Sequence, residues 1–256
     1  MRASLPRTIW IIIRTLYSTL KISIMGLYLR YRGAYDREFA DRILRWWAGF
    51  LLESVDCTYE VSNKHAVKIT TGKPFIIMSN HLSHYDIPLI FVALPGSIRM
   101  LTKKELFKVP IWGRALKAAE FLSIDRHNRE QAIKDLDNAR AQMATGLAVW
   151  IAPEGTRSRS GKLGTFKKGG FVLAIQTQAM IIPVGITGSE KILHANSLLK
   201  FNLSQHVKVN IGPPIDASRY SLESRDQLIE NTRDAIATLT GEKKQADLLP
   251  TGTDML

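Results

Sequence analysis

The residues best suited to chemistry lie in the segment Asn80-His81-Leu82-Ser83-His84-Tyr85-Asp86, which directly follows the apolar run Phe75–Ser79. A histidine and an aspartate at the exit of a buried strand can act as a general base and the carboxylate that orients it. Positions i and i+5 of an ideal helix point about 140° apart, so His81 and Asp86 touch only if a turn leads from the strand into a helix. A plain helix start, with Ser83 or Asp86 as its cap, explains the same residues, and the heptapeptide alone leaves both interpretations open.

Charge and cysteine content narrow the class of partner. The chain of 256 residues carries a net charge of +12, which favours nucleic acid, phosphorylated substrates or an anionic membrane surface as a partner. The sequence has neither zinc-finger spacing nor an aromatic-basic RNA-binding motif, which argues against nucleic acid. The single cysteine, Cys57, excludes an intramolecular disulfide, and no Cys/His cluster has zinc-ligand spacing, so we expect no metal site.

Residues 1–55 predict an amphipathic two-helix hairpin that docks on a membrane. The apolar stretch Thr8–Leu29 is interrupted by Arg14 and Lys21, seven residues apart and hence on nearly one helical face. Such a helix suits the interface of an anionic membrane, and after a break at Gly33 a second amphipathic segment follows over Asp36–Glu53. The alternatives are an ordinary helical hairpin packed on the main domain, or a tilted span whose two charges reach the headgroups.

Residues 56–240 predict an α/β domain, in which a central mixed sheet is flanked by helices. Short apolar, β-branched runs alternate with helical patterns, which is typical of this class. The expected strands cover Phe75–Ser79, Ile98–Thr102, Phe121–Ile124, Leu147–Ala152, Met180–Thr187 and Val207–Gly212, and the expected helices cover Arg129–Met143, Phe171–Thr177 and Leu222–Thr240. Residues 241–256 are polar with Gly and Pro, and we expect a flexible tail there.

Cations follow several of these strands. Lys and Arg at neighbouring strand exits, near a histidine, suggest a shared anion site that binds phosphate by charge and by forked hydrogen bonds. The residues concerned are Lys103 and Lys104, then Arg126 after Asp125, then Arg157 in the segment Pro153-Glu154-Gly155-Thr156-Arg157. Each of them alone is also explained as a solvated charge, a surface ion pair or a helix cap.

Taken in order, four segments closely resemble the motifs of the glycerolipid acyltransferases, the family of bacterial 1-acyl-glycerol-3-phosphate acyltransferases. The segments are Asn80-His81-x-Ser83-x-x-Asp86, then Lys103-x-Glu105-Leu106-x-x-x-Pro110-x-x-Gly113 reaching Ile124-Asp125-Arg126, then Pro153-Glu154-Gly155-Thr156-Arg157-Ser158, then Ile182-Pro183-Val184. The resemblance covers about residues 60 to 190, and the N-terminal hairpin also looks like the membrane-docking element of the bacterial enzymes. It implies a monotopic or peripheral protein on the cytoplasmic face of the inner membrane.

The resemblance implies that His81 is the general base and that Asp86 orients it. The free hydroxyl of a lysophospholipid acceptor, 1-acyl-glycerol-3-phosphate, would attack an acyl thioester and give phosphatidic acid. The donor would be acyl-CoA or acyl-carrier protein, as co-substrate, and no other cofactor is implied. The sequence agrees, because it lacks the Gly-x-Ser-x-Gly elbow of a covalent serine; Ser83, inside the turn, is interpreted as structural.

The second and third motifs resemble the acceptor-phosphate site of the family. This implies Lys103, Arg126 and Arg157 as phosphate-binding cations and Lys104 as a weaker one. Glu154, Gly155 and Thr156 belong to the third motif, where Glu154 would fix the loop or a substrate hydroxyl, and the backbone that follows is a candidate for an oxyanion hole. The fourth motif is associated with the acyl-side pocket.

Two residues depart from the family pattern, and three other functions stay open. Ala152 stands where many relatives carry Phe, and His84 is a second histidine that competes with His81 as the base. The alternative functions are acyl transfer to another lysophospholipid or to glycerol-3-phosphate, hydrolysis of the thioester, and non-catalytic binding of anionic lipid. Retention of both His81 and Asp86 argues against the last of these.

Overall fold

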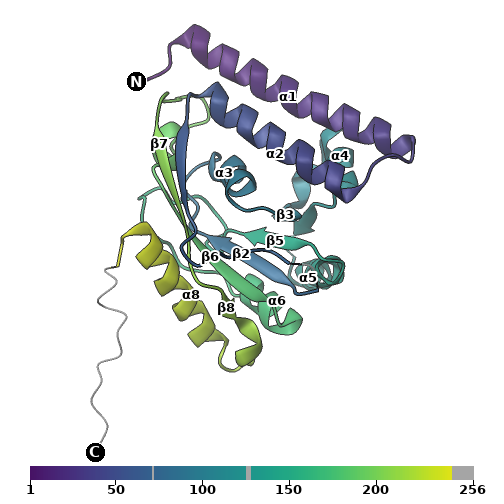
Figure 1. Ribbon diagram of the computed structural model, residues 1–256, viewed down its shortest axis with the longest axis vertical. Helices are drawn as coiled ribbons and strands as arrows, with labels where there is room; N and C mark the ends of the chain where they lie inside the picture. Colours follow the sequence, from purple (N-terminus) through teal and green to yellow (C-terminus); the bar gives the residue numbers. More distant parts are fainter. Residues whose placement is uncertain (71, 125–127, 244–256) are drawn as a thin grey trace, which may run out of the picture.

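The structure is a computed structural model that describes residues 1–70, 72–124 and 128–243. Two long helices at the N-terminus precede an α/β domain, as expected from the sequence (Figure 1). The helices are α1 (Leu5–Tyr31), α2 (Arg37–Ser54), α3 (Asp86–Ala93), α4 (Trp112–Ala118), α5 (Arg129–Ala144), α6 (Gly169–Thr177), α7 (Ser189–Ile192) and α8 (Arg225–Thr240), with 3-10 turns η1 (Lys104–Lys108) and η2 (Ala217–Arg219). The strands are β1 (Thr58–Ser62), β2 (Phe75–Ser79), β3 (Ile98–Lys103), β4 (Leu122–Ile124), β5 (Ala148–Ile151), β6 (Met180–Thr187), β7 (His206–Ile211) and β8 (Ile215–Asp216).

The predicted mixed sheet is confirmed. Its strand order is β1-β7-β6-β2-β5-β3-β4, and β8 pairs with β6. The β6-β2-β5-β3-β4 part is parallel, whereas β7 and β8 run antiparallel to β6. All five residues of β2 are buried, because this central strand is covered on both faces, and such strands are nearly continuous apolar runs.

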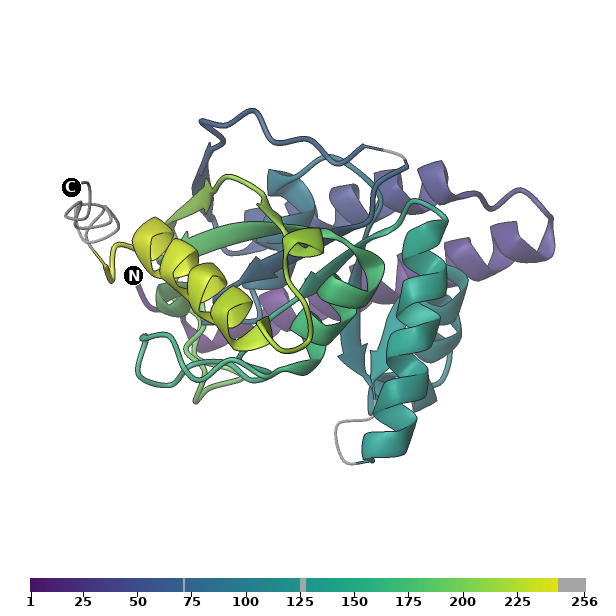
Figure 2. The same ribbon diagram turned by 90° about the horizontal axis from the view of Figure 1, so that it is seen from below.

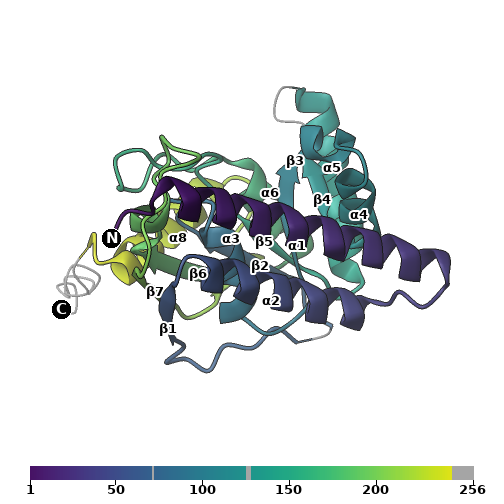
Figure 3. The same cartoon turned by 90° about the horizontal axis from the view of Figure 1, so that it is seen from above.

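Two apolar cores lie on the two faces of the sheet. The alternation of β2 divides its side chains between them: Ile77 packs with α2 and α3, whereas Ile76 and Met78 pack with α6 and α8. Figure 2 shows α8, α6 and α5 on the near side of the sheet, and Figure 3, from above, shows α1 and α2 across the other side. The carboxyl end of β2, which carries the first motif, therefore lies beneath the hairpin.

Polar caps define both hairpin helices. The Ser4 side chain accepts a hydrogen bond from the N–H of Arg7 at the start of α1, and the Asp36 carboxylate accepts one from the N–H of Phe39 at the start of α2. Between the helices Gly33 adopts a φ of +67°, a conformation that favours glycine. The break predicted at Gly33 is thus confirmed.

The hairpin is also tied to the sheet by a buried ion pair. The Arg99 side chain at the start of β3 is 0% exposed, and its Nη1 donates to Asp41 Oδ1 of α2 at 2.6 Å. Nearby, the Arg37 guanidinium binds both oxygens of Glu120, at 2.8 and 2.7 Å. Because these contacts join α2 to the strand that precedes the second motif, the hairpin packs on the α/β domain as well as presenting an outer face.

Candidate active site

The His81–Asp86 pair forms across a turn between β2 and α3. The Nδ1–H of His81 donates to Asp86 Oδ2 at 2.8 Å, and the same oxygen accepts the backbone N–H groups of Leu82 at 2.7 Å and Ser83 at 2.9 Å. These two backbone bonds fold residues 81–86 into a turn, after which α3 begins at Asp86. The predicted contact across a turn is confirmed, and it argues against the alternative of a plain capped helix start.

Asp86 is fully buried and its second oxygen is also used. Oδ1 accepts a hydrogen bond from the hydroxyl of Ser189, at the start of α7. The position of Asp86 in the first turn of α3 favours a negative charge there, because helix N-termini are partially positive. Ser189 was not foreseen, since it is 103 residues away from Asp86 along the chain and no local pattern connects them.

This arrangement leaves the other nitrogen of His81 free for chemistry. With Nδ1 donating to the carboxylate, Nε2 of the neutral ring carries the lone pair that can take a proton. The side chain of His81 is 17% exposed, which allows a substrate to reach it. The ring also meets that of Trp150 edge to face at 6.0 Å, and Trp150 is held by a hydrogen bond from its Nε1 to Ser79 Oγ at 3.0 Å.

Asn80 and Ser83 hold the turn in place. The Asn80 amide binds both the N–H and the C=O of Ile186 in β6, at 2.8 and 2.7 Å. The buried Ser83 hydroxyl donates to the carbonyl oxygen of Leu193 at 2.8 Å. Since Ser83 is buried and its proton is engaged by a backbone carbonyl, the geometry agrees with a structural residue and not with a nucleophile.

The third motif is attached to the first through Glu154. Its Oε1 accepts the backbone N–H of His81 at 3.0 Å, and its Oε2 accepts that of Gly164 at 2.8 Å. In return, the carbonyl oxygen of His81 accepts the N–H of Ser158 at 2.7 Å. Burial raises the pKa of the Glu154 carboxyl, against these backbone hydrogen bonds. Of the two roles expected for Glu154, the geometry supports fixing of the loop, because both oxygens bind backbone groups.

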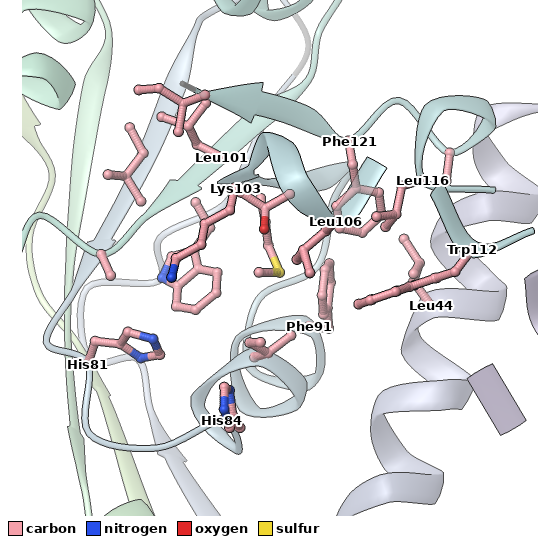
Figure 4. Close-up of a pocket in the computed structure, with 18 of the residues that line it drawn as sticks. Leu44, His81, His84, Phe91, Leu101, Lys103, Leu106, Trp112, Leu116 and Phe121 are labelled. Carbon is pink, nitrogen blue, oxygen red and sulfur yellow. The ribbon is translucent and has the colours of Figure 1, made fainter. Parts of the chain in front are cut away.

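His81 opens into a cavity of about 880 Å³ that runs between the end of the sheet and the hairpin. Figure 4 shows His81, His84 and Lys103 gathered at one end, while Leu44, Trp112, Leu116 and Phe121 lie at the other. Most of the lining is apolar, and α1, α2, α3, β3 and α4 all contribute to it. A cavity of this kind suits a molecule with a polar end and a long hydrocarbon chain.

The structure brings together most of the predicted anion-binding residues. Lys103, Gly155, Thr156 and Arg157 line the cavity that contains His81. In the described part of the chain, Nη1 of Arg157 is buried without a hydrogen-bond partner, and burial lowers the pKa of this guanidinium. A buried guanidinium nitrogen without a partner is costly unless a ligand supplies an acceptor, so Arg157 marks a place for an anion.

Lys104, another predicted cation, is not part of this group. Lys104 lines a second cavity, of about 410 Å³, together with Lys117, Ser123 and Asn138, and not the cavity of His81. The chain turns between Lys103 and Lys104, where β3 ends and η1 begins, so their side chains diverge. Arg126 lies outside the described residues.

The remaining motif residues take packing roles. A Cβ atom on Gly113 would lie 2.1 Å from the carbonyl oxygen of Phe107, which explains glycine at the start of α4 beside the cavity wall. Ile182, Pro183 and Val184 lie in β6, alongside β2, and none of them lines the cavity. The acyl-pocket role that the resemblance implied for the fourth motif therefore has no support in the lining.

His84 is the second histidine at the polar end of the cavity. Burial lowers its pKa to about 4, and the positive charge of Arg157 adds to the effect. The ring is therefore neutral at pH 7, and within the described residues it has no hydrogen bond to a carboxylate like the one that orients His81. The structure thus favours His81 over His84 as the base.

Helix α1 turns its large apolar side chains away from the protein. Its buried residues are mostly small or polar, namely Thr8, Ile11, Ser18, Ser23 and Gly26. Eight of the exposed ones recur every three or four residues and form a stripe along the helix, here called the α1 stripe: Leu5, Ile9, Ile13, Leu16, Leu20, Ile24, Tyr28 and Tyr31. This pattern is the reverse of that of a helix on a soluble protein.

The charges within α1 do not interrupt this stripe. The Arg14 guanidinium lies 3.9 Å from the ring of Phe50, and the Lys21 ammonium lies 5.3 Å from that of Trp46, so both contact α2. The basic stripe expected at the membrane interface is thus turned toward the second helix. By length and composition alone, α1 is also long and apolar enough to cross a membrane.

Comparison with known proteins agrees with this geometry. A chloroplastic 1-acyl-sn-glycerol-3-phosphate acyltransferase of Arabidopsis thaliana is 29% identical over 201 residues, 77% of this chain and 55% of its own length. The human 1-acyl-sn-glycerol-3-phosphate acyltransferase alpha is 29% identical over 67% of this chain and 60% of its own length. The chain thus spans 55% and 60% of these two curated relatives.

A solved structure shows the same fold. The crystal structure of the 1-acyl-sn-glycerophosphate (LPA) acyltransferase PlsC from Thermotoga maritima matches with a TM-score of 0.71 and 24% sequence identity, over 96% of this chain and 100% of that one. The family model Acyltransferase matches residues 58–187, which is just over half of the chain and contains all four motifs. The chain therefore belongs to the Acyltransferase family.

Proposed function

We propose that this protein transfers an acyl chain from an acyl thioester to the free hydroxyl of 1-acyl-glycerol-3-phosphate, which gives phosphatidic acid. The observation that carries the proposal is the His81–Asp86 pair at the polar end of an apolar cavity that also contains Lys103 and Arg157. The names of the curated relatives support the same acceptor.

In the proposed reaction, Nε2 of His81 takes the proton of the acceptor hydroxyl as its oxygen attacks the thioester carbonyl. A carbon–oxygen bond forms, the carbon–sulfur bond breaks, and the departing thiolate takes the proton back from His81. The Asp86 carboxylate stabilises the imidazolium that exists between these steps. Backbone N–H groups after Gly155 are the candidate donors to the developing oxyanion.

Substrate placement follows from the two ends of the cavity. Arg157 and Lys103 would bind the acceptor phosphate, since a guanidinium can bind phosphate oxygens through two parallel hydrogen bonds. The apolar part of the cavity would hold an acyl chain. The donor would be acyl-CoA or acyl-carrier protein, both of them acidic partners for a chain of net charge +12.

The hairpin would seat the protein on an anionic membrane surface, at the cytoplasmic face of the cell membrane. The α1 stripe supports this placement, because it exposes a row of large apolar side chains on one side of the molecule. Such a position gives the cavity direct access to a lipid acceptor.

Product analysis by mass spectrometry tests the proposal. The purified protein is given a mixture of lysophospholipid and glycerol-3-phosphate acceptors with each of the two donor types. Phosphatidic acid is expected from 1-acyl-glycerol-3-phosphate, and His81→Ala and Asp86→Asn should each lower its formation by roughly 10²- to 10⁴-fold. His206→Ala, an exposed histidine on β7, is the matched control.

Each other enzymatic function gives a different product, whereas non-catalytic lipid binding gives none. Free fatty acid without any newly acylated lipid would indicate thioester hydrolysis. A different diacylated lipid would identify another lysophospholipid as the acceptor, and newly formed monoacyl-glycerol-3-phosphate would identify glycerol-3-phosphate. Equal product from the wild type and from the His81→Ala/Asp86→Asn double variant would overturn the assigned base.

A further inference from the structure

Two adjacent leucines protrude from the loop between α7 and β7. Leu198 is 67% exposed and Leu199 is 60% exposed. Ser197 holds this tip in shape, because its hydroxyl accepts the N–H groups of Leu199 at 3.3 Å and Lys200 at 2.9 Å. Single exposed apolar residues are common, but a fixed pair at a loop tip marks a contact surface. Residues 197–200 are called the Leu198 tip below.

The Leu198 tip lies beside the start of α1. The N–H of Ala3 donates to the carbonyl oxygen of Phe201 at 2.9 Å, and Arg2 and Asn202 form an antiparallel bridge. Because the pairing is antiparallel, the segment from Phe201 back to Leu199 lies alongside the residues that lead into α1. Leu5, the first residue of α1, is 74% exposed and begins the α1 stripe. Figure 3 shows this end of α1 beside the green loops that precede β7.

The charges around the Leu198 tip complement an anionic surface. Arg2, Lys191 and Lys200 are exposed, and none of them belongs to an ion pair within residues 1–70, 72–124 and 128–243. The neighbouring acid, Glu190, uses one oxygen to accept the N–H of Gly188. Exposed leucines bordered by unpaired cations are the pattern of segments that insert into the interface of an anionic bilayer.

We propose that the Leu198 tip is a second membrane contact, which inserts into the same anionic leaflet as the α1 stripe. The inference rests on the membrane-docking part of the proposed function. One lipid-facing helix leaves the protein free to rotate about the helix axis, whereas a second contact beside its N-terminus fixes that rotation. The bilayer is favoured as the occupant because the tip continues a surface that is already apolar and basic.

The Leu198 tip is also connected to the candidate catalytic pair. The short helix α7 precedes it, and Ser189 of that helix donates to Asp86. At the end of α7, the carbonyl oxygen of Leu193 accepts the hydroxyl of Ser83 at 2.8 Å. Insertion of the tip would therefore hold the His81 turn at a set height over the headgroups, where the acceptor hydroxyl lies.

Fluorescence quenching by lipid tests the contact directly. In a Cys57→Ser background, Leu198→Cys is labelled with an environment-sensitive fluorophore, and the full-length protein is mixed with phosphatidylglycerol and phosphatidylcholine vesicles whose acyl chains carry bromine. Leu16→Cys, on the α1 stripe, is the positive control. Leu222→Cys is the matched exposed leucine, three residues before α8, a helix that packs in the other apolar core than α2. Blue-shifted, quenched emission is expected at positions 198 and 16, and unquenched emission at position 222.

The controls separate this inference from the proposed docking of the hairpin. Quenching at position 16 without quenching at position 198 would overturn the Leu198 tip and leave hairpin docking intact. No quenching at either position would overturn both. Equal quenching at position 222 would show that the protein adsorbs without a fixed orientation. If the tip is not quenched and its substitution abolishes self-association of the protein, the tip is a protein interface. Either result would overturn the proposal.

Binding of variants gives an independent measure. The double variant Leu198→Asp/Leu199→Asp should lower the vesicle partition coefficient by roughly tenfold or more, since each leucine loses its apolar burial in lipid. Its unfolding temperature should match that of the wild type, because both side chains are exposed. Lys191→Glu/Lys200→Glu should weaken binding to anionic vesicles but not to purely zwitterionic ones. Unchanged partition of both double variants would overturn the proposal.

Discussion

At the scale of single residues, Arg157 has the strongest reason to bind an anion. Its Nη1 is buried in the cavity without a partner in the described chain, and burial lowers its pKa. Arg157→Ala should therefore raise KM for the phosphate-bearing acceptor by roughly 10- to 100-fold, as expected for loss of charged hydrogen bonds, with a smaller effect on kcat. Initial rates over a range of acceptor concentrations measure both constants.

The same loop offers a control for this prediction. Arg159 is exposed and does not line the cavity, so Arg159→Ala should leave the acceptor KM near the wild-type value. Arg157→Lys should fall between the wild type and Arg157→Ala, because it keeps the charge but loses the planar fork. An unchanged KM with a large fall in kcat for Arg157→Ala would instead place this residue at the reacting carbonyl.

His84 predicts a pH dependence of stability. Burial, then the positive charges of Arg157, His81 and Lys103, lower the pKa of His84 from 6.5 to about 4. The Asp86 carboxylate opposes this shift. The unfolded chain therefore binds this proton at a higher pH than the folded chain, so the contribution of neutral His84 is present above pH 6.5 and is lost as the pH falls toward about 4. The wild type should lose more thermal stability than His84→Asn over this window.

Unfolding temperatures of the two proteins at a series of pH values check this expectation. The difference should be small near pH 7 and should grow in the acid direction. Parallel curves for wild type and His84→Asn would show that the ring titrates alike in the folded and unfolded chains.

At the scale of elements, the ion pair between α2 and β3 controls how the hairpin sits on the sheet. Arg99 is fully buried, and its main anionic partner is Asp41. Asp41→Ala would leave this guanidinium buried without that carboxylate, which should lower the free energy of unfolding by about 3–5 kcal/mol. Denaturant unfolding in detergent, with Glu38→Ala as an exposed control on the same helix, measures the loss. Equal stability of the two variants would contradict an anchoring role for Asp41.

Elements with strong local patterns were predictable, and edge or short elements were not. Strand β2 has the bounds expected from its run Phe75–Ser79, because a strand buried on both faces is continuously apolar. Strand β1 (Thr58–Ser62) was missed since it is an edge strand with mostly exposed side chains. Helix α4 (Trp112–Ala118) was missed because two turns are too short to show a helical period.

In the candidate site, too, local contacts were predictable from the sequence and long-range contacts were not. The contact of His81 with Asp86 could be predicted because both residues lie in one short segment whose family resemblance implies the pair, although the spacing alone left a plain helix start open. The contacts of Asp86 with Ser189 and of Asn80 with Ile186 could not, since each joins segments more than a hundred residues apart. The divergence of Lys103 and Lys104 also required the structure, because it depends on where β3 ends.

At the scale of the whole molecule, the hairpin has two faces with different tasks. The inner face of α2 belongs to the core, with Leu44, Ala48 and Leu52 buried. Removal of residues 1–55 should therefore unfold the domain and is not a usable test of membrane binding. The side chains of the α1 stripe are exposed instead, so Leu16→Ser/Leu20→Ser/Ile24→Ser should detach the protein from vesicles while its unfolding temperature stays close to that of the wild type.

Activity should then depend on how the acceptor is presented. With 1-acyl-glycerol-3-phosphate embedded in vesicles, the triple variant should lose most of its activity, because the protein no longer concentrates at the membrane. With a short-chain acceptor dissolved below its micelle concentration, it should retain its activity, because the His81–Asp86 pair and the cations of the cavity are untouched. Equal losses on both forms of acceptor would show that the α1 stripe supports the cavity itself, and equal retention on both would show that membrane access does not depend on α1.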